Sequence, residues 1–70
     1  MKINDDCRKR FGSRLHSLRK ERHKTQKEVA DAIDVSPQVI SCYEKGNYFP
    51  SAVHCIRLVN YFGISIDELL

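Results

Sequence analysis

Apolar residues near the start of the chain recur with the spacing of a helix. Phe11, Leu15 and Leu18 stand at positions i, i+4 and i+7, which places them on one face of an amphipathic helix. Asp5 and Asp6 come before this face, and acidic residues are favoured at a helix N-terminus. We therefore predict a first helix that begins after Asp5 or Asp6, with one apolar face and a largely basic remainder.

The next segment begins with a capping signal. Thr25-Gln26-Lys27-Glu28 fits a capping box, in which the Thr25 hydroxyl and the Glu28 carboxylate each accept a hydrogen bond from an otherwise unpaired backbone N–H. We predict a short second helix that starts here and ends at Asp34. Its buried face comprises Val29, Ala30 and Ile33.

A proline marks the start of a third helix, over about residues 37–45. Pro37 suits the first helical position, where no N–H is needed, and Ser36 before it is a candidate N-cap. Gly46 stands where a left-handed residue is expected after a helix. The inward side of this helix comprises Ile40 and Tyr43.

Two further helices complete the pattern. Ser51 caps a fourth helix, which ends at Gly63. Its apolar face comprises Ala52, Cys55, Ile56, Val59 and Phe62. Ser65 to Glu68 forms a second capping box, flanked by Ile64 and Leu69 as a hydrophobic staple, and starts a fifth helix. Because no segment alternates as a strand would, we predict a compact all-α domain of five helices.

Length and composition narrow the class of protein. The chain has 70 residues, which is one domain with a thin core and no room for a deep cavity. No apolar run approaches the ~20 residues of a membrane span, and the N-terminus lacks the apolar segment of a secretory signal. The three cysteines are odd in number and far apart, so we expect no disulfide framework and a cytoplasmic location.

Charge is distributed unevenly along the chain. Nine basic residues and one acidic residue fall between Arg8 and Lys27, a net charge of +8, whereas residues 28–70 carry −4. Such asymmetry points to a polyanionic partner, either nucleic acid or an anionic membrane, but a solvated basic helix face is an equally good interpretation. Binding to a membrane is the weaker reading, because the apolar face of the first helix is needed for the core.

Cysteine and histidine spacing predicts neither a metal site nor an enzyme. His16 and His23 are seven residues apart with no cysteine pair nearby, and the chain has no C-x2-C motif. No nucleophile–base–acid set can be assembled from the spacing, and we expect no cofactor. Cys55 fits a buried apolar position. Cys42 is a candidate for oxidation if it is exposed on the third helix.

Residues 26–45 form the most informative unit. Two short helices are joined by a tight turn, with the small residue Ala30 where they approach, as in a helix-turn-helix. The second of these helices presents four uncharged residues outward, Pro37, Gln38, Ser41 and Cys42. An uncharged outward face is suited to contact with base edges in a DNA groove.

These features resemble the lambda-repressor-like (XRE/Cro-type) helix-turn-helix family over residues 11–70. The shared motifs are Phe11-Gly12, Leu15, Leu18-Arg19, Thr25-Gln26, Glu28-Val29-Ala30, Val35-Ser36, Val39-Ile40-Ser41, Tyr43-Glu44-Lys45-Gly46, Pro50-Ser51, Leu58 and the run from Phe62 to Leu69. The resemblance implies a five-helix DNA-binding domain that enters the major groove with residues 37–45.

The resemblance also implies roles for individual residues. Base contacts fall to Pro37, Gln38, Ser41 and Cys42, and Gln38 is the foremost because its amide can pair with adenine N6 and N7. Phosphate contacts fall to Thr25, Gln26, Ser36, Lys45, Asn47 and Tyr48. Gln26 can also brace the recognition helix. Arg19 and Glu44 match an internal ion pair between the first helix and the recognition helix.

Three positions depart from the family pattern. Asp34 occupies the turn position usual for glycine, which Asp tolerates at a cost of about 1 kcal/mol. Pro37 can offer a base only an apolar contact, and Cys42 is small where longer side chains are common. We therefore expect few direct base contacts.

The function implied is sequence-specific binding of double-stranded DNA by a prokaryotic or phage transcription regulator, most simply a repressor. We expect a homodimer that binds two half-sites about one helical turn apart. The expected dimer surface is residues 64–70, because a thin core cannot bury Ile66, Leu69 and Leu70 together. The alternative is an antitoxin or restriction-system controller that also binds a protein partner, such as a toxin or a C-terminal sensor segment.

Overall fold

The computed structural model describes residues 5–70. This part of the chain forms the helices α1 (Asp5–Glu21), α2 (Gln26–Ile33), α3 (Pro37–Glu44), α4 (Ala52–Phe62) and α5 (Ile66–Leu69). The predicted all-α class with five helices is confirmed for these residues. The prediction about a secretory signal rests partly on residues 1–4, which lie outside the described residues.

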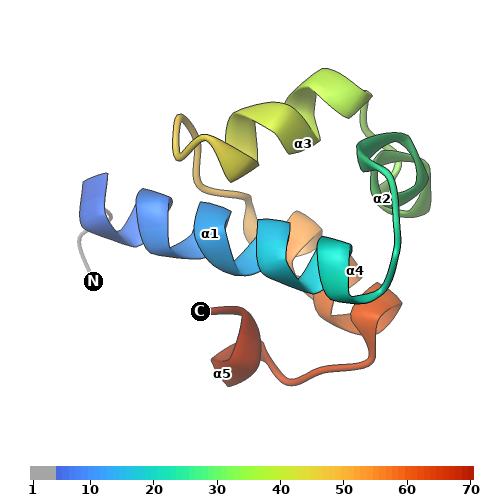
Figure 1. Ribbon diagram of the computed structural model, residues 1–70. Coiled ribbons are helices and arrows are strands. Elements are labelled where there is room, and N and C mark those ends of the chain that lie inside the picture. The colour runs from blue at the N-terminus through green and yellow to red at the C-terminus, as the bar shows by residue number, and fades with distance from the viewer. Residues whose placement is uncertain (1–4) are drawn as a thin grey trace.

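Helix α1 lies in the middle of the molecule, and Figure 1 shows α3 on one side of it and α5 on the other. The turn from α2 to α3 brings these two helices into contact, and α2 also packs on α4. The described residues measure 29 × 24 × 21 Å. Because both α1 and α2 pack against it, α3 has one side left for a partner.

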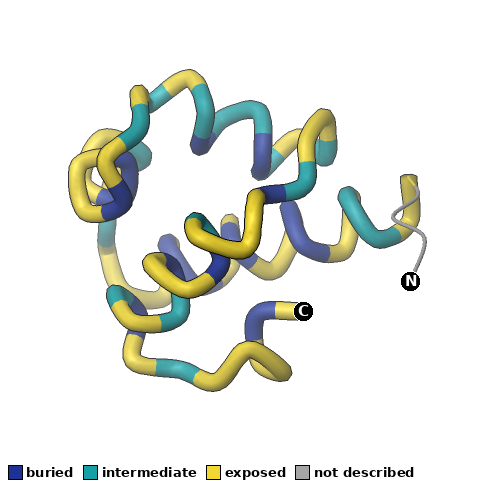
Figure 2. Tube along the Cα trace, turned by 180° about the vertical axis from the view of Figure 1, so that it is seen from behind, coloured by how far each residue is buried: buried dark blue, intermediate teal, exposed yellow. Residues whose placement is uncertain are grey.

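A single apolar core joins all five helices. The predicted faces of α1, α2 and α3 are buried as expected. The buried core residues are Phe11, Leu15, Leu18, Val29, Ala30, Ile33, Ile40, Tyr43, Leu58, Phe62 and Leu69. In Figure 2 the buried stretches of the tube lie mainly where the helices face one another. Tyr43 is therefore a core residue, with its ring edge-on to Phe11 at 5.7 Å.

The predicted apolar face of α4 is partly wrong. Cys55 and Phe62 are buried, but Ala52 and Ile56 are exposed, Ile56 by 57%. Leu58, which falls between Cys55 and Phe62 at helical spacing, is fully buried instead. The core meets α4 along this narrower strip because the main packing contacts of α4 are with α2 and α5.

Capping accounts for most of the helix boundaries. The Thr25 capping box is complete, with both reciprocal hydrogen bonds at 3.0 Å. Within residues 5–70, the Ser65 box forms only in part, since the Ser65 hydroxyl accepts the Glu68 amide at 3.3 Å without a return bond. Ser36 is the N-cap residue of α3, but its hydroxyl makes no capping bond there.

Asp34 makes the turn between α2 and α3 in the left-handed conformation, with φ 63° and ψ 48°. The next amide, that of Val35, donates to the Ala30 carbonyl at 3.0 Å, which closes the helix in the manner of a Schellman motif. Gly46 has positive φ, as predicted, and Gly63, which ends α4 as expected, has positive φ as well.

No helix in the described part of the chain is long and apolar enough to cross a membrane. Among the same residues, no group of His, Cys, Asp or Glu side chains is arranged to hold a metal ion.

Candidate nucleic-acid interface

The outward side of α3 contains the four residues for which base contacts are predicted. Ile40 and Tyr43 turn inward and are buried. Gln38 is exposed, whereas Pro37, Ser41 and Cys42 are partly exposed. A helix is about 10–12 Å wide and the major groove of B-DNA is about 12 Å wide, so this side of α3 can enter the groove while the other stays in the core.

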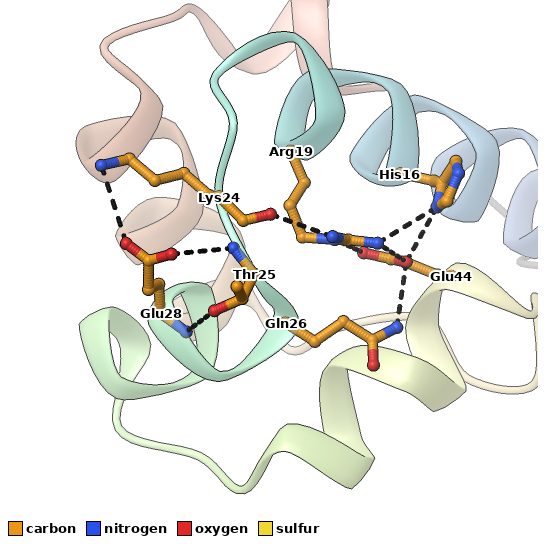
Figure 3. A network of polar contacts seen from close by, with 7 residues as sticks. All are labelled: His16, Arg19, Lys24, Thr25, Gln26, Glu28 and Glu44. Atoms are coloured by element: carbon orange, nitrogen blue, oxygen red, sulfur yellow. Dashed lines mark hydrogen bonds and ion pairs between the residues drawn. The ribbon is translucent and has the colours of Figure 1, made fainter.

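The carboxylate of Glu44 ties the end of α3 to α1. Arg19 donates from Nε to Glu44 Oε2 at 2.7 Å and from Nη2 to Oε1 at 3.0 Å. His16 Nδ1 also lies 3.0 Å from Oε1. Both side chains of the Arg19–Glu44 pair are less than 10% exposed. Figure 3 shows Arg19 and His16 of α1, together with Gln26 of α2, converging on Glu44.

This network favours the charged forms of both Arg19 and Glu44. Burial acts to raise the pKa of Glu44, but hydrogen bonds from Arg19, His16 and Gln26 outweigh it and lower that pKa. The hydrogen bond to Glu44 likewise raises the pKa of Arg19. Arg19 also donates to the Lys24 carbonyl at 2.9 Å, so it fixes the α1–α2 turn and α3 together.

Gln26 lies at the start of α2 and touches the same network. Its Nε2 donates to Glu44 Oε1 at 3.2 Å, which agrees with the implied bracing of the recognition helix. An amide nitrogen has two hydrogens, so one remains for another acceptor. Gln26 can therefore brace α3 and contact a phosphate with the same group.

An open hollow of about 670 Å³ borders the N-terminal end of α3. It is lined by Arg19, Lys20, His23, Lys24, Thr25, Gln26, Lys27 and Pro37. Two predicted phosphate-contacting residues, Thr25 and Gln26, thus lie among side chains that are mostly cationic. No phosphate-contacting role was predicted from the sequence for four basic residues of the hollow, Lys20, His23, Lys24 and Lys27. The only signal for them in the sequence was the basic stretch from Arg8 to Lys27.

Several arginines in the basic stretch have partners within the fold. Arg14 donates to the Glu68 carbonyl and Arg22 to the Phe62 carbonyl, each in the last turn of a helix. Arg57, from the C-terminal part, donates to the Ile33 carbonyl at 3.0 Å. Such cations stabilise helix C-termini. Around the hollow, Lys27 pairs with Asp31 at 3.1 Å and Lys24 with Glu28 at 4.0 Å. All four of these side chains are more than 40% exposed, so an external anion can compete with these surface pairs.

The remaining predicted phosphate-contacting residues lie elsewhere along α3. Lys45, Asn47 and Tyr48 follow its C-terminus and are exposed, Tyr48 by 61%. Phe49 next to them packs on Phe11 instead, with ring centres 5.4 Å apart. Ser36 is exposed at the opposite end, next to the hollow residue Pro37. Candidate phosphate contacts therefore flank α3 at both ends.

Comparison with known proteins identifies the class. A family model described as helix-turn-helix matches residues 15–69, which is most of the chain. The chain belongs to the XRE/Cro-type, lambda-repressor-like helix-turn-helix family. This family comprises non-enzymatic transcription regulators, which agrees with the prediction that the domain is not an enzyme.

Individual relatives differ in size and role. The chain is 37% identical over 60 residues to the cryptic phage CTXphi transcriptional repressor RstR of Vibrio cholerae, covering 86% of this chain and 54% of RstR. It is 33% identical over 60 residues to the transcriptional activator BcrR of Enterococcus faecalis, covering 86% of this chain and 29% of BcrR. The chain thus spans about half or less of the length of these curated relatives.

Among solved structures, the restriction-modification controller protein C.AhdI from Aeromonas hydrophila superimposes with a TM-score of 0.83. The match covers 89% of this chain and 94% of C.AhdI, at 26% sequence identity. The five-helix arrangement is therefore shared along almost the full length of both chains.

Proposed function

We propose that this domain binds double-stranded DNA in a sequence-specific manner and regulates transcription. The observation that supports this most strongly is the uncharged outward side of α3, held by the Glu44 network and flanked at both ends by groups that can contact phosphates. A helix that presents base contacts from a fixed position between phosphate contacts is the arrangement of a helix-turn-helix bound to DNA.

In this proposal α3 enters the major groove. Gln38 contacts a base edge through its amide, with Ser41 adding a hydroxyl and Pro37 and Cys42 offering small or apolar contacts. Around α3, the phosphate contacts come from Thr25, Gln26, Ser36, Lys45, Asn47 and Tyr48, supplemented by Lys20, Lys24 and Lys27. The lysines add affinity for any DNA sequence, whereas specificity rests on few direct base contacts.

The domain acts as a homodimer in this proposal. One α3 offers few base contacts, so two half-sites about one helical turn apart supply the necessary specificity. Leu69 is fully buried, whereas Ile66 is 43% and Leu70 is 41% exposed. These two apolar side chains in residues 64–70 are available for contact with a second copy.

Repression is the simplest regulatory outcome. Occupying an operator blocks other proteins from the same DNA, and this needs only the groove and phosphate contacts described above. Activation would need an additional contact with the transcription machinery. RstR, a repressor, and BcrR, an activator, show that relatives of this chain take both roles.

Fluorescence anisotropy on a duplex selected from random sequence tests the proposal. We expect affinity to fall steeply between 50 and 200 mM salt, on the order of a hundredfold or more, because several phosphates are contacted. A scrambled duplex of equal length serves as the control. Failure to select any preferred sequence, or affinity that hardly changes with salt, would contradict the proposal.

A second candidate function is control of a restriction–modification system. The observation in its favour is the match to C.AhdI over 94% of that chain. A methyltransferase or endonuclease reading frame next to the gene, with the selected operator between them, would support this function. A neighbouring toxin gene, and a complex between the two products, would instead support an antitoxin.

A further inference from the structure

We propose that Gly12 is a positioning residue that sets how closely the recognition helix sits on α1, an inference that rests on the proposed DNA-binding function. Gly12 is the eighth residue of the 17-residue helix α1 and is buried. Glycine is among the least favourable residues for a helix interior. Its presence in mid-helix therefore calls for a local reason.

The reason is the close approach of the backbone of α3. A Cβ atom at residue 12 would lie 2.4 Å from the carbonyl oxygen of Tyr43 and 2.8 Å from that of Glu44. Ordinary van der Waals contact begins at 3.4 Å. An alanine here would push the end of α3 away by about 1 Å, since both obstructing atoms belong to the backbone and cannot turn aside.

Contacts with α1 and α4 also hold the end of α3. The Tyr43 ring packs on Phe11, and its hydroxyl lies 2.9 Å from His54 Nδ1 on α4. The Glu44 side chain is held by Arg19, which follows Gly12 on α1 by two helical turns and so lies on the same face. Helix α1 thus contacts residue 44 twice, at its backbone through Gly12 and at its carboxylate through Arg19.

A displacement at this point is transmitted to the DNA-binding surface. Ser41 and Cys42 directly precede Tyr43 on the same short helix, so they move with it. Binding groups have to be held within about 0.5 Å of the productive geometry to work well. A shift of α3 disturbs base contacts, whereas the lysines around the hollow lie on α1, the α1–α2 turn and α2 and keep their place.

The test compares Gly12→Ala with Ser17→Ala, an exposed site on the same helix. Each variant is first shown to be folded by circular dichroism and urea unfolding. Anisotropy then measures affinity for the selected operator and for a scrambled duplex. We expect Gly12→Ala to lose about tenfold in the ratio of the two affinities, the size of one good base contact. We expect Ser17→Ala to keep the ratio of the wild type.

Each outcome decides a different question. A folded Gly12→Ala protein with the wild-type ratio overturns the role of Gly12 while leaving the proposed function intact. A wild-type protein that prefers no sequence overturns the proposed function itself. If the Gly12→Ala single variant does not fold, Asp34→Gly is added to stabilise the turn, because residue 34 is left-handed and glycine favours that conformation. The comparison is then made between the Asp34→Gly variant and the double variant that carries both substitutions. An unchanged ratio in that pair likewise overturns the proposal.

Discussion

At the scale of the residue, Glu44 shows how a buried charge can serve a surface function. Its carboxylate is almost fully buried at the end of α3 and receives hydrogen bonds from Arg19, His16 and Gln26. A buried ion pair adds little net stability compared with apolar packing, but its loss is costly because one charge is left without a partner. The pair is therefore better understood as a device that fixes the position of α3 relative to α1 and α2.

Replacing Glu44 tests this interpretation. We expect Glu44→Gln to lower the free energy of unfolding at pH 7 by about 3 kcal/mol, because the guanidinium of Arg19 stays buried without its counter-charge. The pKa of Glu44 is lowered in the folded state, so its contribution is complete above the ordinary pKa of Glu, about 4.3, and is lost as the pH falls through the lowered value. The difference between wild type and variant should therefore shrink below about pH 4.

Urea unfolding at pH 7, 5 and 3 measures this difference, with Glu21→Gln as the control because Glu21 is an exposed acid on α1. We expect the control to change stability by at most about 0.5 kcal/mol at each pH. If the difference in the free energy of unfolding between the wild type and Glu44→Gln stays constant down to pH 3, the charge of Glu44 is not what stabilises the fold.

Gln38 and Gln26 should have separate roles in binding. Gln38 is exposed on α3, so Gln38→Ala should cost about 1–3 kcal/mol at one base pair of the operator and little on a scrambled duplex. Gln26 lies beside the basic hollow, so Gln26→Ala should weaken binding to both duplexes alike. Anisotropy with single-base-pair variants of the operator measures both effects. Equal loss of sequence preference in the two variants would contradict this division of roles.

At the scale of the element, capping residues made most helix boundaries predictable. Thr25, Gly46 and Gly63 have the conformations that their positions require, because each satisfies a purely local need of the backbone. The burial of α4 was less predictable. Ile56 and Leu58 are equally apolar, and only the tertiary contacts with α2 and α5 decide that Leu58 is buried and Ile56 exposed.

The turn between α2 and α3 offers a test at this scale. Asp34 has φ 63°, a region that costs most residues other than glycine about 1 kcal/mol. Its negative charge also lies at the C-terminus of α2, where the helix dipole disfavours it. We therefore expect Asp34→Gly to raise the free energy of unfolding by about 1 kcal/mol and Asp34→Ala to lower it. Thermal and urea unfolding measure both, and a stabilising Asp34→Ala would contradict the role of backbone strain.

At the scale of the whole molecule, six of the nine basic residues between Arg8 and Lys27 form two groups in different surroundings. Arg14, Arg19 and Arg22 bind carbonyls or a carboxylate within the fold. Lys20, Lys24 and Lys27 gather around the hollow beside α3, where Lys24 and Lys27 make exposed ion pairs with neighbouring acids of α2. The charge asymmetry of the sequence predicted a polyanionic partner but not this division, because the groups that Arg14, Arg19 and Arg22 bind are far from them in the chain.

The other face of the molecule holds the surface proposed for dimerisation. Ile66 and Leu70 are one helical turn apart near α5, and both are partly exposed. A charge placed at residue 66 would have to be buried against a second copy. We therefore expect Ile66→Glu to weaken the dimer at least about tenfold, or 1.4 kcal/mol. Val53→Glu is the matched control, since Val53 on α4 is 54% exposed and lies outside residues 64–70.

Sedimentation equilibrium measures the dimer constant, and anisotropy on a full operator and on a single half-site measures its consequence for DNA binding. Ile66→Glu should lose affinity for the full operator but keep the wild-type affinity for one half-site, because α3 lies on the opposite side of α1 from α5 (Figure 1). Loss of the dimer in Val53→Glu together with an intact dimer in Ile66→Glu would move the interface from residues 64–70 to the exposed side of α4. A wild-type protein that is monomeric both alone and on the full operator would contradict the proposed dimer surface. The specificity of binding would then have to come from the contacts of a single α3.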